Sequence, residues 1–168
     1  FRVAGVLWYP GCNDASTLST SLDYESQMTA LINQYRKVFD ESTLPFLYVQ
    51  LARWSGYQYT QNVRQGQLRT LDNANLRNSA NVAMTVSIDT DKGTSKVIHP
   101  LGKDILGARM AAQYEAMVAG ESVPSGPIIE SATRSADKSA ITLSFKDGTA
   151  DKLRSMKPNY SKSATASA

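Results

Sequence analysis

The 168-residue chain has one cysteine, Cys12, and one histidine, His99. A single cysteine excludes an intrachain disulfide framework. Nothing near Cys12 in the sequence marks its thiol as reactive, so we take it to be a buried, inert group. A single histidine restricts acid–base chemistry, because no other side chain has an unperturbed pKa near neutrality. A general base working at pH 7 is therefore most simply His99.

Long hydrophobic runs and clustered charge are missing as well. The longest apolar stretch, residues 3–9, is too short to span a bilayer. The net charge is +3, and the basic excess lies in residues 146–168, which hold five basic and two acidic side chains. The rest of the chain is balanced, so we expect no nucleic-acid partner. Hydrophobic residues make up 42% of the chain, which suits one compact domain with a sizeable core.

Short apolar runs alternate with amphipathic stretches over the first 127 residues. The apolar runs predict buried strands over residues 2–9, 46–51 and 82–88. The amphipathic stretches predict helices over residues 24–40, 61–75 and 103–119. This βαβαβα order favours a parallel sheet covered by helices. After residue 127 we predict two antiparallel strands, over residues 128–133 and 140–145, within a β extension that ends at residue 160. Residues 161–168 are small and polar, as in a disordered tail.

The first candidate site is the glycine turn after the first strand. A turn at Gly11 can bring backbone N–H groups and the Asn13 amide close to a substrate, which is the donor arrangement that an oxyanion needs. A strand followed by an ordinary Asx turn also explains this segment. Farther along, Arg64 and Gln67 are three residues apart and share one face of a predicted helix. A solvated helix face is the alternative interpretation of that pair.

The second candidate site is the loop around His99. Pro100 suits the first turn of the third predicted helix. His99 then lies at a strand-to-helix junction, where open α/β sheets bind their ligands. Asp89 and Asp91 precede it, and an acid near a histidine can fix its tautomer and stabilise the imidazolium ion. A structural or surface histidine is the alternative.

Together these segments resemble sialate O-acetylesterases, which are carbohydrate esterases of the SGNH/GDSL hydrolase superfamily. The resemblance is colinear from about Val3 to Pro127. Its motifs in chain order are Gly5-Val6-Leu7-Trp8-Tyr9-Pro10-Gly11, Tyr24, Leu31-Ile32, Tyr35-Arg36, Phe39, Leu44-Pro45-Phe46, Val49-Gln50-Leu51-Ala52, Arg64, Gln67, Met84, Asp89, Ile98-His99-Pro100, Lys103, Gly107, Arg109 and Ser125-Gly126-Pro127. The resemblance implies a three-layer α/β/α, flavodoxin-like parallel sheet, with residues 1–127 forming a partial SGNH-hydrolase-like domain that lacks its N-terminal part.

The resemblance also implies an activity, the removal of acetyl groups from sugars by a Ser-His-Asp mechanism. His99 would be the base of the triad, with Asp91 as the first choice for its acid partner and Asp89 as the second. The residues implied at the oxyanion and substrate sites are Gly11, Asn13, Arg64, Gln67 and Trp8. We expect an O-acetylated carbohydrate substrate, no cofactor and no metal. The resemblance also favours an extracytoplasmic setting, whether secreted, periplasmic or lysosomal.

The sequence departs from the family at three places. The family's serine lies in a Gly-x-Ser-Asn segment upstream of the first strand, and no serine of these 168 residues stands in such a context. Cys12 replaces a glutamate, and Val97 stands where many members carry an acid. Two hypotheses therefore remain. One is an acetylesterase whose serine lies outside this chain, so that the chain alone is inactive.

The other hypothesis is an inactive carbohydrate-binding or subunit-interaction remnant of the same fold. Exposed aromatic side chains, Trp54, Tyr57 and Tyr59, could then stack on sugar rings, and a core or lid role is the alternative. In either case a sheet without its first strand and helix has an unpaired edge and an apolar face. We expect an N-terminal fragment, a second chain or another copy to cover them.

Overall fold

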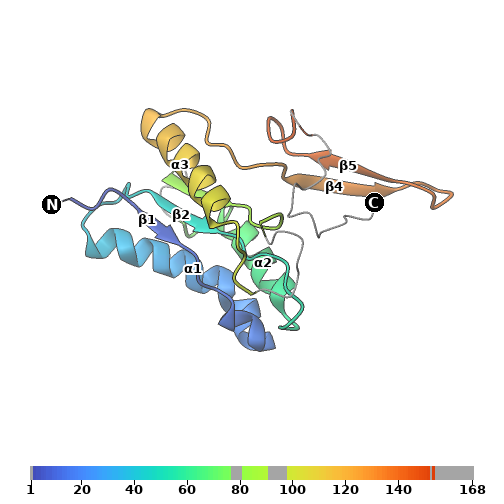
Figure 1. The fold of residues 1–168 in the computed structure, drawn as a ribbon, viewed down its shortest axis with the longest axis horizontal. Helices are drawn as coiled ribbons and strands as arrows, with labels where there is room; N and C mark the ends of the chain where they lie inside the picture. Colours follow the sequence, from blue (N-terminus) through green and yellow to red (C-terminus); the bar gives the residue numbers. More distant parts are fainter. Residues whose placement is uncertain (1, 77–80, 91–97, 152, 154–168) are drawn as a thin grey trace.

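Three strands form a parallel sheet, as the alternation of apolar and amphipathic segments predicts. The computed structural model describes residues 2–76, 81–90, 98–151 and 153 (Figure 1). The strand order is β1-β2-β3. The strands are β1 (Val6–Trp8), β2 (Phe46–Val49) and β3 (Val82–Thr85). Each strand ends before its predicted boundary, because the apolar pattern continues into loops that pack at the carboxyl edge of the sheet.

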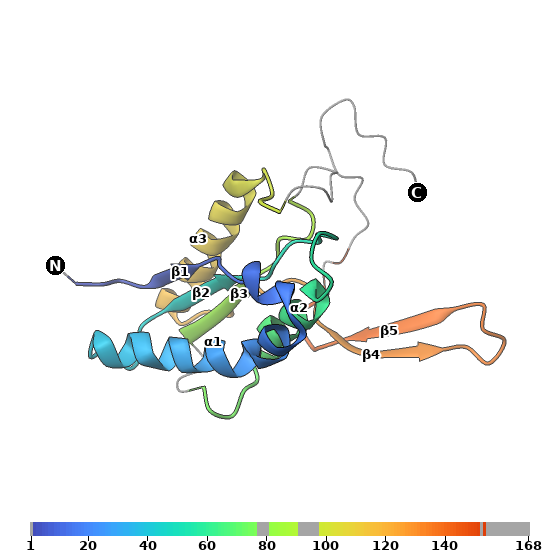
Figure 2. The ribbon, with the colours of Figure 1, turned by 90° about the horizontal axis from the view of Figure 1, so that it is seen from below.

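Helices cover both faces of this sheet. The helices are the 3-10 turn η1 (Asn13–Ser16), α1 (Leu18–Val38), α2 (Thr60–Thr70) and α3 (Lys103–Ala119). Figure 2 shows α1 below the strands and α3 above them, and α2 packs beside α1. The predicted three-layer α/β/α arrangement is therefore confirmed for the described residues. None of the helices among these residues is long and apolar enough to cross a membrane.

The central strand β2 joins two hydrophobic clusters, one on each face of the sheet. Phe46 and Tyr48 pack with side chains of α1 and α2, such as Ile32 and Val63. The alternate residues, Leu47 and Val49, pack with Leu106 and Met110 of α3. All four residues of β2 are buried. A strand that is buried on both faces has a continuous run of apolar residues, so this strand could be predicted from the sequence.

The start of α1 and the place of Pro100 before α3 differ from the predictions. Helix α1 begins at Leu18 rather than near Tyr24, because Thr17 caps it: the backbone N–H of Thr20 donates to Thr17 Oγ1 at 3.3 Å. Helix α3 begins at Lys103 as predicted, with Gly102 as its N-cap. Pro100 therefore lies outside the helix rather than in its first turn.

Strand β1 lies at an edge of the sheet. It pairs with β2 on one side, and among the described residues no strand pairs with its other side. Val6 and Trp8 face the α1 layer, whereas Leu7 points to the other face and is 66% exposed. Helix α3 packs on β2 and β3. The predicted open edge and uncovered apolar residue are therefore present in the described part of the chain.

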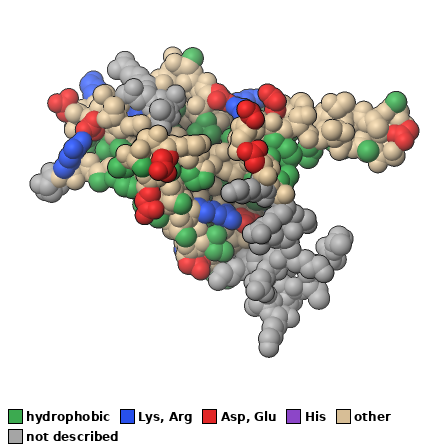
Figure 3. Space-filling view, turned by 90° about the horizontal axis from the view of Figure 1, so that it is seen from above, with side chains coloured by type: hydrophobic (Ala, Val, Ile, Leu, Met, Phe, Trp, Pro, Cys, Tyr) green, Lys and Arg blue, Asp and Glu red, His purple; other side chains and the backbone are tan. Residues whose placement is uncertain are grey.

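The C-terminal antiparallel pair is also confirmed. Strands β4 (Ile129–Arg134) and β5 (Ile141–Phe145) form a hairpin that projects from the rest of the molecule (Figure 3). Lys146 Nζ at its base forms an ion pair with Asp72 after α2, at 2.9 Å. The division at residues 127 and 160 stays a prediction, and the predicted tail over residues 161–168 lies outside the described residues.

Truncation of Phe46 tests whether β2 carries the core. Phe46 is fully buried, so Phe46→Ala should lower the free energy of unfolding by about 3–5 kcal/mol by leaving a cavity. Leu143→Ala is the control, because Leu143 lies on the hairpin and is 45% exposed; its cost should stay below about 0.5 kcal/mol. Urea denaturation followed by circular dichroism measures both. Equal losses would contradict this assignment of the core.

Candidate active site

The two predicted site segments meet at the carboxyl edge of the sheet. Cys12, next to the glycine turn, and Ile98, next to His99, line one small cavity. The loop after β2 supplies most of the remaining wall, including Trp54 and Tyr57, and η1 and α2 complete it. Segments almost 90 residues apart in the sequence therefore converge where adjacent parallel strands end, which is the usual ligand position in open α/β sheets.

Strands β1 and β2 separate at this edge, and Pro10 explains why. The ladder begins with Val6 N–H donating to Pro45 O at 2.9 Å, and residue n of β1 pairs with residue n + 40 of β2. Parallel ladders repeat every two residues, so the next positions would join residue 10 to Val49 O and Leu51 N. Proline has no N–H to donate to Val49. The ladder cannot continue there.

The side chain of Gln67 takes the place of residue 10 in that ladder. Gln67 Nε2 donates to Val49 O at 3.2 Å, and Leu51 N–H donates to Gln67 Oε1 at 2.8 Å. The opposite edge of β2 stays bonded to β3, because Gln50 N–H donates to Thr85 O. Gln67 is 1% exposed. Its amide thus completes the backbone bonds of β2 where β1 leaves the sheet.

Tyr24 of α1 holds the glycine turn through its hydroxyl group. Its hydroxyl donates to Pro10 O at 3.2 Å, and Gln67 Nε2 donates to the same hydroxyl at 3.4 Å. Gly11 has φ 134°, and a Cβ on it would lie 3.1 Å from the Tyr24 hydroxyl. The turn therefore needs glycine, both for its backbone angle and for the close approach of the ring.

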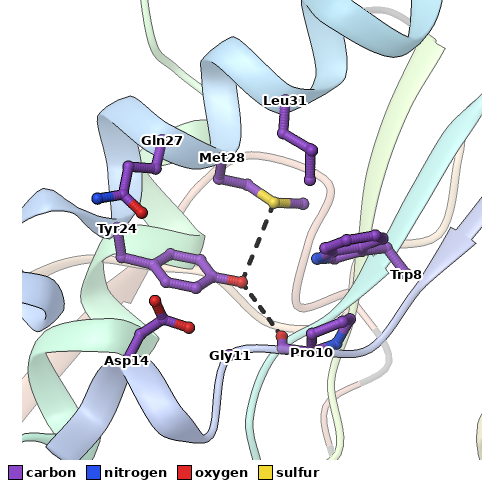
Figure 4. Close-up of a pocket in the computed structure, with 8 residues that line it drawn as sticks. All are labelled: Trp8, Pro10, Gly11, Asp14, Tyr24, Gln27, Met28 and Leu31. Atoms are coloured by element: carbon purple, nitrogen blue, oxygen red, sulfur yellow. Dashed lines mark hydrogen bonds between the residues drawn. The ribbon is translucent and has the colours of Figure 1, made fainter.

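A cavity of about 300 Å³ lies beside this turn, along the open edge of β1 (Figure 4). Its residues are Trp8, Pro10, Gly11, Asp14, Tyr24, Gln27, Met28 and Leu31. Trp8 and Gly11, both predicted at the substrate or oxyanion site, thus share one cavity. Asn13 is exposed at the start of η1, and its backbone oxygen accepts from Ser16 Oγ at 2.6 Å. The oxyanion role of Gly11 and Asn13 stays a prediction.

The loop that carries His99 returns to the end of β3. Gly102 N–H donates to Thr90 O at 2.9 Å, so the loop closes on itself next to the strand. A Cβ on Gly102 would lie 2.9 Å from Thr90 O, which requires glycine at this close approach. Ile98 is half-buried and Pro100 is buried, whereas His99 between them is exposed. The imidazole is thus presented to solvent beside the cavity of Cys12.

Only one of the two candidate acids, Asp89, lies among the described residues; Asp91 lies outside them. Asp89 accepts two hydrogen bonds from Arg109, at 2.8 and 2.6 Å. The Arg109 guanidinium lowers the pKa of Asp89, against partial burial, which raises it. Arg109 also donates to Val86 O, which fixes the ion pair beneath the loop. The triad-acid role of either residue stays a prediction.

Arg64 and Gln67 do share a helix face, but that face is turned toward the sheet. Arg64 is half-buried and donates from Nη1 to Leu51 O, and burial lowers its pKa. The solvated-face alternative is therefore wrong. Their predicted contact with a substrate is not tested. The spacing of three residues predicted that the two side chains share a helix face, but it did not show what this face packs against.

Lys103, Tyr9 and Cys12 form a cluster that the sequence did not single out as a site. Lys103 Nζ lies 4.3 Å from the centre of the Tyr9 ring. Burial raises the pKa of the Cys12 thiol, while the charge of Lys103 opposes that rise. A thiol with a raised pKa stays protonated at neutral pH, which argues against a nucleophilic role. The position of Lys103 directly after the His99 loop was the available signal.

The aromatic side chains of the loop after β2 are partly buried, which agrees with the alternative of a packing role. Trp54, Tyr57 and Tyr59 are each half-buried. Trp54 and Tyr57 pack edge to face, with ring centres 4.8 Å apart. These rings close the wall of the cavity next to Cys12, so part of their surface is used in packing. Within the described residues, no three His, Cys, Asp or Glu side chains are placed to hold a metal ion.

The Asp89–Arg109 pair makes stability depend on pH. Because the folded state lowers the pKa of Asp89, the pair stabilises the protein above the ordinary carboxylate pKa, and this contribution is lost as the pH falls through the lowered value. Asp89→Asn should cost less than about 1 kcal/mol near pH 7, since both groups are partly exposed. The difference should vanish in acid. Urea denaturation across pH measures it, with Asp151→Asn as the control; a difference that persists in acid would contradict the assignment.

The fold and this edge define a class: an SGNH-like esterase fold in which a glycine turn and a histidine loop meet at the carboxyl ends of parallel strands. The chain belongs to the carbohydrate esterase family of sialic acid-specific acetylesterases, whose family model matches residues 2–116. The resemblance found in the sequence is therefore confirmed. A comparison with curated proteins gives no match.

Two solved structures are similar to this chain. One is a carbohydrate acetylesterase from Xanthomonas citri, with 31% identity and a TM-score of 0.71 over 87% of this chain and 33% of that one. The other is a protein from Arabidopsis thaliana, with 21% identity and a TM-score of 0.55 over 72% of this chain and 46% of that one; it shows the fold alone. The present chain thus spans about a third of the Xanthomonas protein and about half of the Arabidopsis protein.

Proposed function

We propose that this chain is part of a carbohydrate O-acetylesterase that hydrolyses acetyl esters on sugars with a Ser-His-Asp triad. Family membership supports the reaction class, and the Xanthomonas relative is itself a carbohydrate acetylesterase. The observation that carries the proposal is the convergence of the His99 loop and the Gly11 turn at one edge of the sheet. The serine would come from a segment outside these 168 residues.

The proposed mechanism assigns proton transfer to His99. The serine hydroxyl attacks the acetyl carbonyl while His99 takes its proton, and His99 then returns a proton to the departing sugar oxygen. Asp91, or Asp89 in its place, orients the imidazole. Backbone N–H groups near Gly11, together with the Asn13 amide, stabilise the negative charge on the carbonyl oxygen. A water molecule then releases acetate by the reverse sequence.

The histidine gives the direct test of this function. In a chain extended upstream to include the Gly-x-Ser segment, acetyl ester hydrolysis should fall by at least about a thousandfold in His99→Ala. The control Gln58→Ala, at an exposed residue of the loop after β2, should leave kcat and KM unchanged. Release of acetate from an O-acetylated sugar measures both. Sugar binding by titration without any turnover would instead support an inactive carbohydrate-binding module.

We also propose that the open edge of β1 receives a strand from outside this chain, whether from an upstream segment, a second chain or another copy. The edge strand offers unpaired backbone groups, and Leu7 beside it is 66% exposed. The cavity next to Trp8 and Leu31 runs along the same edge. A strand added there would continue the parallel sheet and cover Leu7. An extracytoplasmic setting is likewise our proposal, on the family resemblance alone.

The 168-residue chain by itself should self-associate through this edge. Leu7→Lys should weaken the association about tenfold, because a lysine on an edge strand opposes pairing with a further strand. Sedimentation velocity over a range of concentrations measures the change. Leu143→Lys on the hairpin is the control and should leave the association unchanged. A stable monomer, or a loss caused by Leu143→Lys alone, would contradict the role of the β1 edge.

A further inference from the structure

Two buried side chains, those of Gln67 and Tyr24, hold the chain where β1 leaves the sheet, in place of backbone pairing. Pro10 ends the ladder because it lacks an N–H, and Gln67 replaces it with one donor and one acceptor. The Pro10 carbonyl would have bonded to Leu51 N–H in a continued ladder. It accepts from the Tyr24 hydroxyl instead. The turn at Gly11 therefore depends on α1 and α2 for its position.

These bonds form a connected chain across the molecule. It runs from Leu51 and Val49 of the β2 end, through the Gln67 amide and the Tyr24 hydroxyl, to the Pro10 carbonyl. All of the Gln67 amide groups thus bond within the protein, and the side chain is 1% exposed. A side chain in this state has no free polar atom to offer a substrate, since contact with one would break a buried backbone bond.

We propose that Gln67 and Tyr24 are positioning residues, which hold the turn from Pro10 to Asn13 at the spacing from the His99 loop that the candidate site requires. They act through the backbone rather than by touching the substrate. The effect on turnover rests on the proposed function. The effect on the turn does not, because it follows from the hydrogen bonds alone.

The only cysteine of the chain provides the readout. Cys12 lies in the turn, two residues after Pro10, and is half-buried, so its rate of alkylation by iodoacetamide under native conditions reports local opening. Tyr24→Phe and Gln67→Leu should each raise that rate about tenfold, because each removes buried hydrogen bonds that hold the turn. Rates are corrected for the unfolded fraction from the measured stability of each variant.

Matched control variants separate this role from a general loss of stability. Gln113 on α3 is buried in the same way, is 3% exposed, and bonds the backbone of Met84 and Pro124 on the opposite face. Tyr114 donates to Ala4 O at 3.3 Å, at the other end of the β1 segment. Gln113→Leu and Tyr114→Phe should change the Cys12 rate by less than about twofold.

A second measurement uses the chain extended upstream to include the serine segment. There Tyr24→Phe and Gln67→Leu should lower kcat for acetyl ester hydrolysis with KM unchanged, as expected for a misplaced oxyanion turn. If Gln67 bound the substrate directly, KM would rise and the Cys12 rate would stay at the wild-type value. That result would overturn the proposal.

The Cys12 alkylation rate and the hydrolysis assay can each contradict a different hypothesis. Equal acceleration of Cys12 alkylation in the variants and their controls would also overturn the proposal. If Gln67→Leu does not fold, Tyr24→Phe decides, because it removes a single hydroxyl. If the extended chain shows no hydrolysis that depends on His99, the proposed function fails, and the Cys12 measurement still decides the positioning role.

Discussion

The arrangement of the carboxyl edge depends on one missing hydrogen-bond donor. Pro10 cannot continue the ladder between β1 and β2, so the strands separate after Trp8. Two backbone groups at the end of β2, Val49 O and Leu51 N–H, would then be buried without partners, at a cost of about 1–3 kcal/mol each. The Gln67 amide prevents that loss by bonding both groups. The separation of the strands is therefore stable, and the cavity lined by Cys12, Leu51 and Ile98 lies between the segments that follow them.

The same solution is used on the opposite face of the sheet. Gln113 of α3 reaches the end of β3 and bonds Met84 O, just as Gln67 of α2 reaches the end of β2. In each case a buried glutamine on a covering helix completes the backbone hydrogen bonds at the carboxyl end of a strand. The loops that follow can then leave the sheet in different directions. This is how a small parallel sheet supports three loops around one edge.

Each part of the candidate site is held by its own hydrogen-bonded contact. The glycine turn rests on Tyr24, and the loop of His99 closes through Gly102 and Thr90 at the end of β3. Both depend on glycines that permit a close approach, Gly11 to the Tyr24 ring and Gly102 to a backbone oxygen. Cys12 lies directly after Gly11 and shares a cavity with Ile98, and burial raises the pKa of its thiol against the charge of Lys103. A thiol with a raised pKa argues against a nucleophilic role for Cys12, whereas the role of His99 stays a proposal.

The sequence determined the order of strands and helices, because burial of β2 and the amphipathic helices leaves a periodic apolar pattern. It also singled out His99 and Gly11 as candidate site residues, since a lone histidine and a glycine after a strand are visible without coordinates. It did not show that Gln67 and Arg64 face the sheet, nor that Trp54 and Tyr57 pack against each other. The contacts of α2 depend on which backbone groups at the end of β2 lack partners. That is settled only when β1 lies beside β2 and the ladder stops at Pro10. Only the tertiary structure therefore decided that polar side chains of α2 bond the backbone at the end of β2.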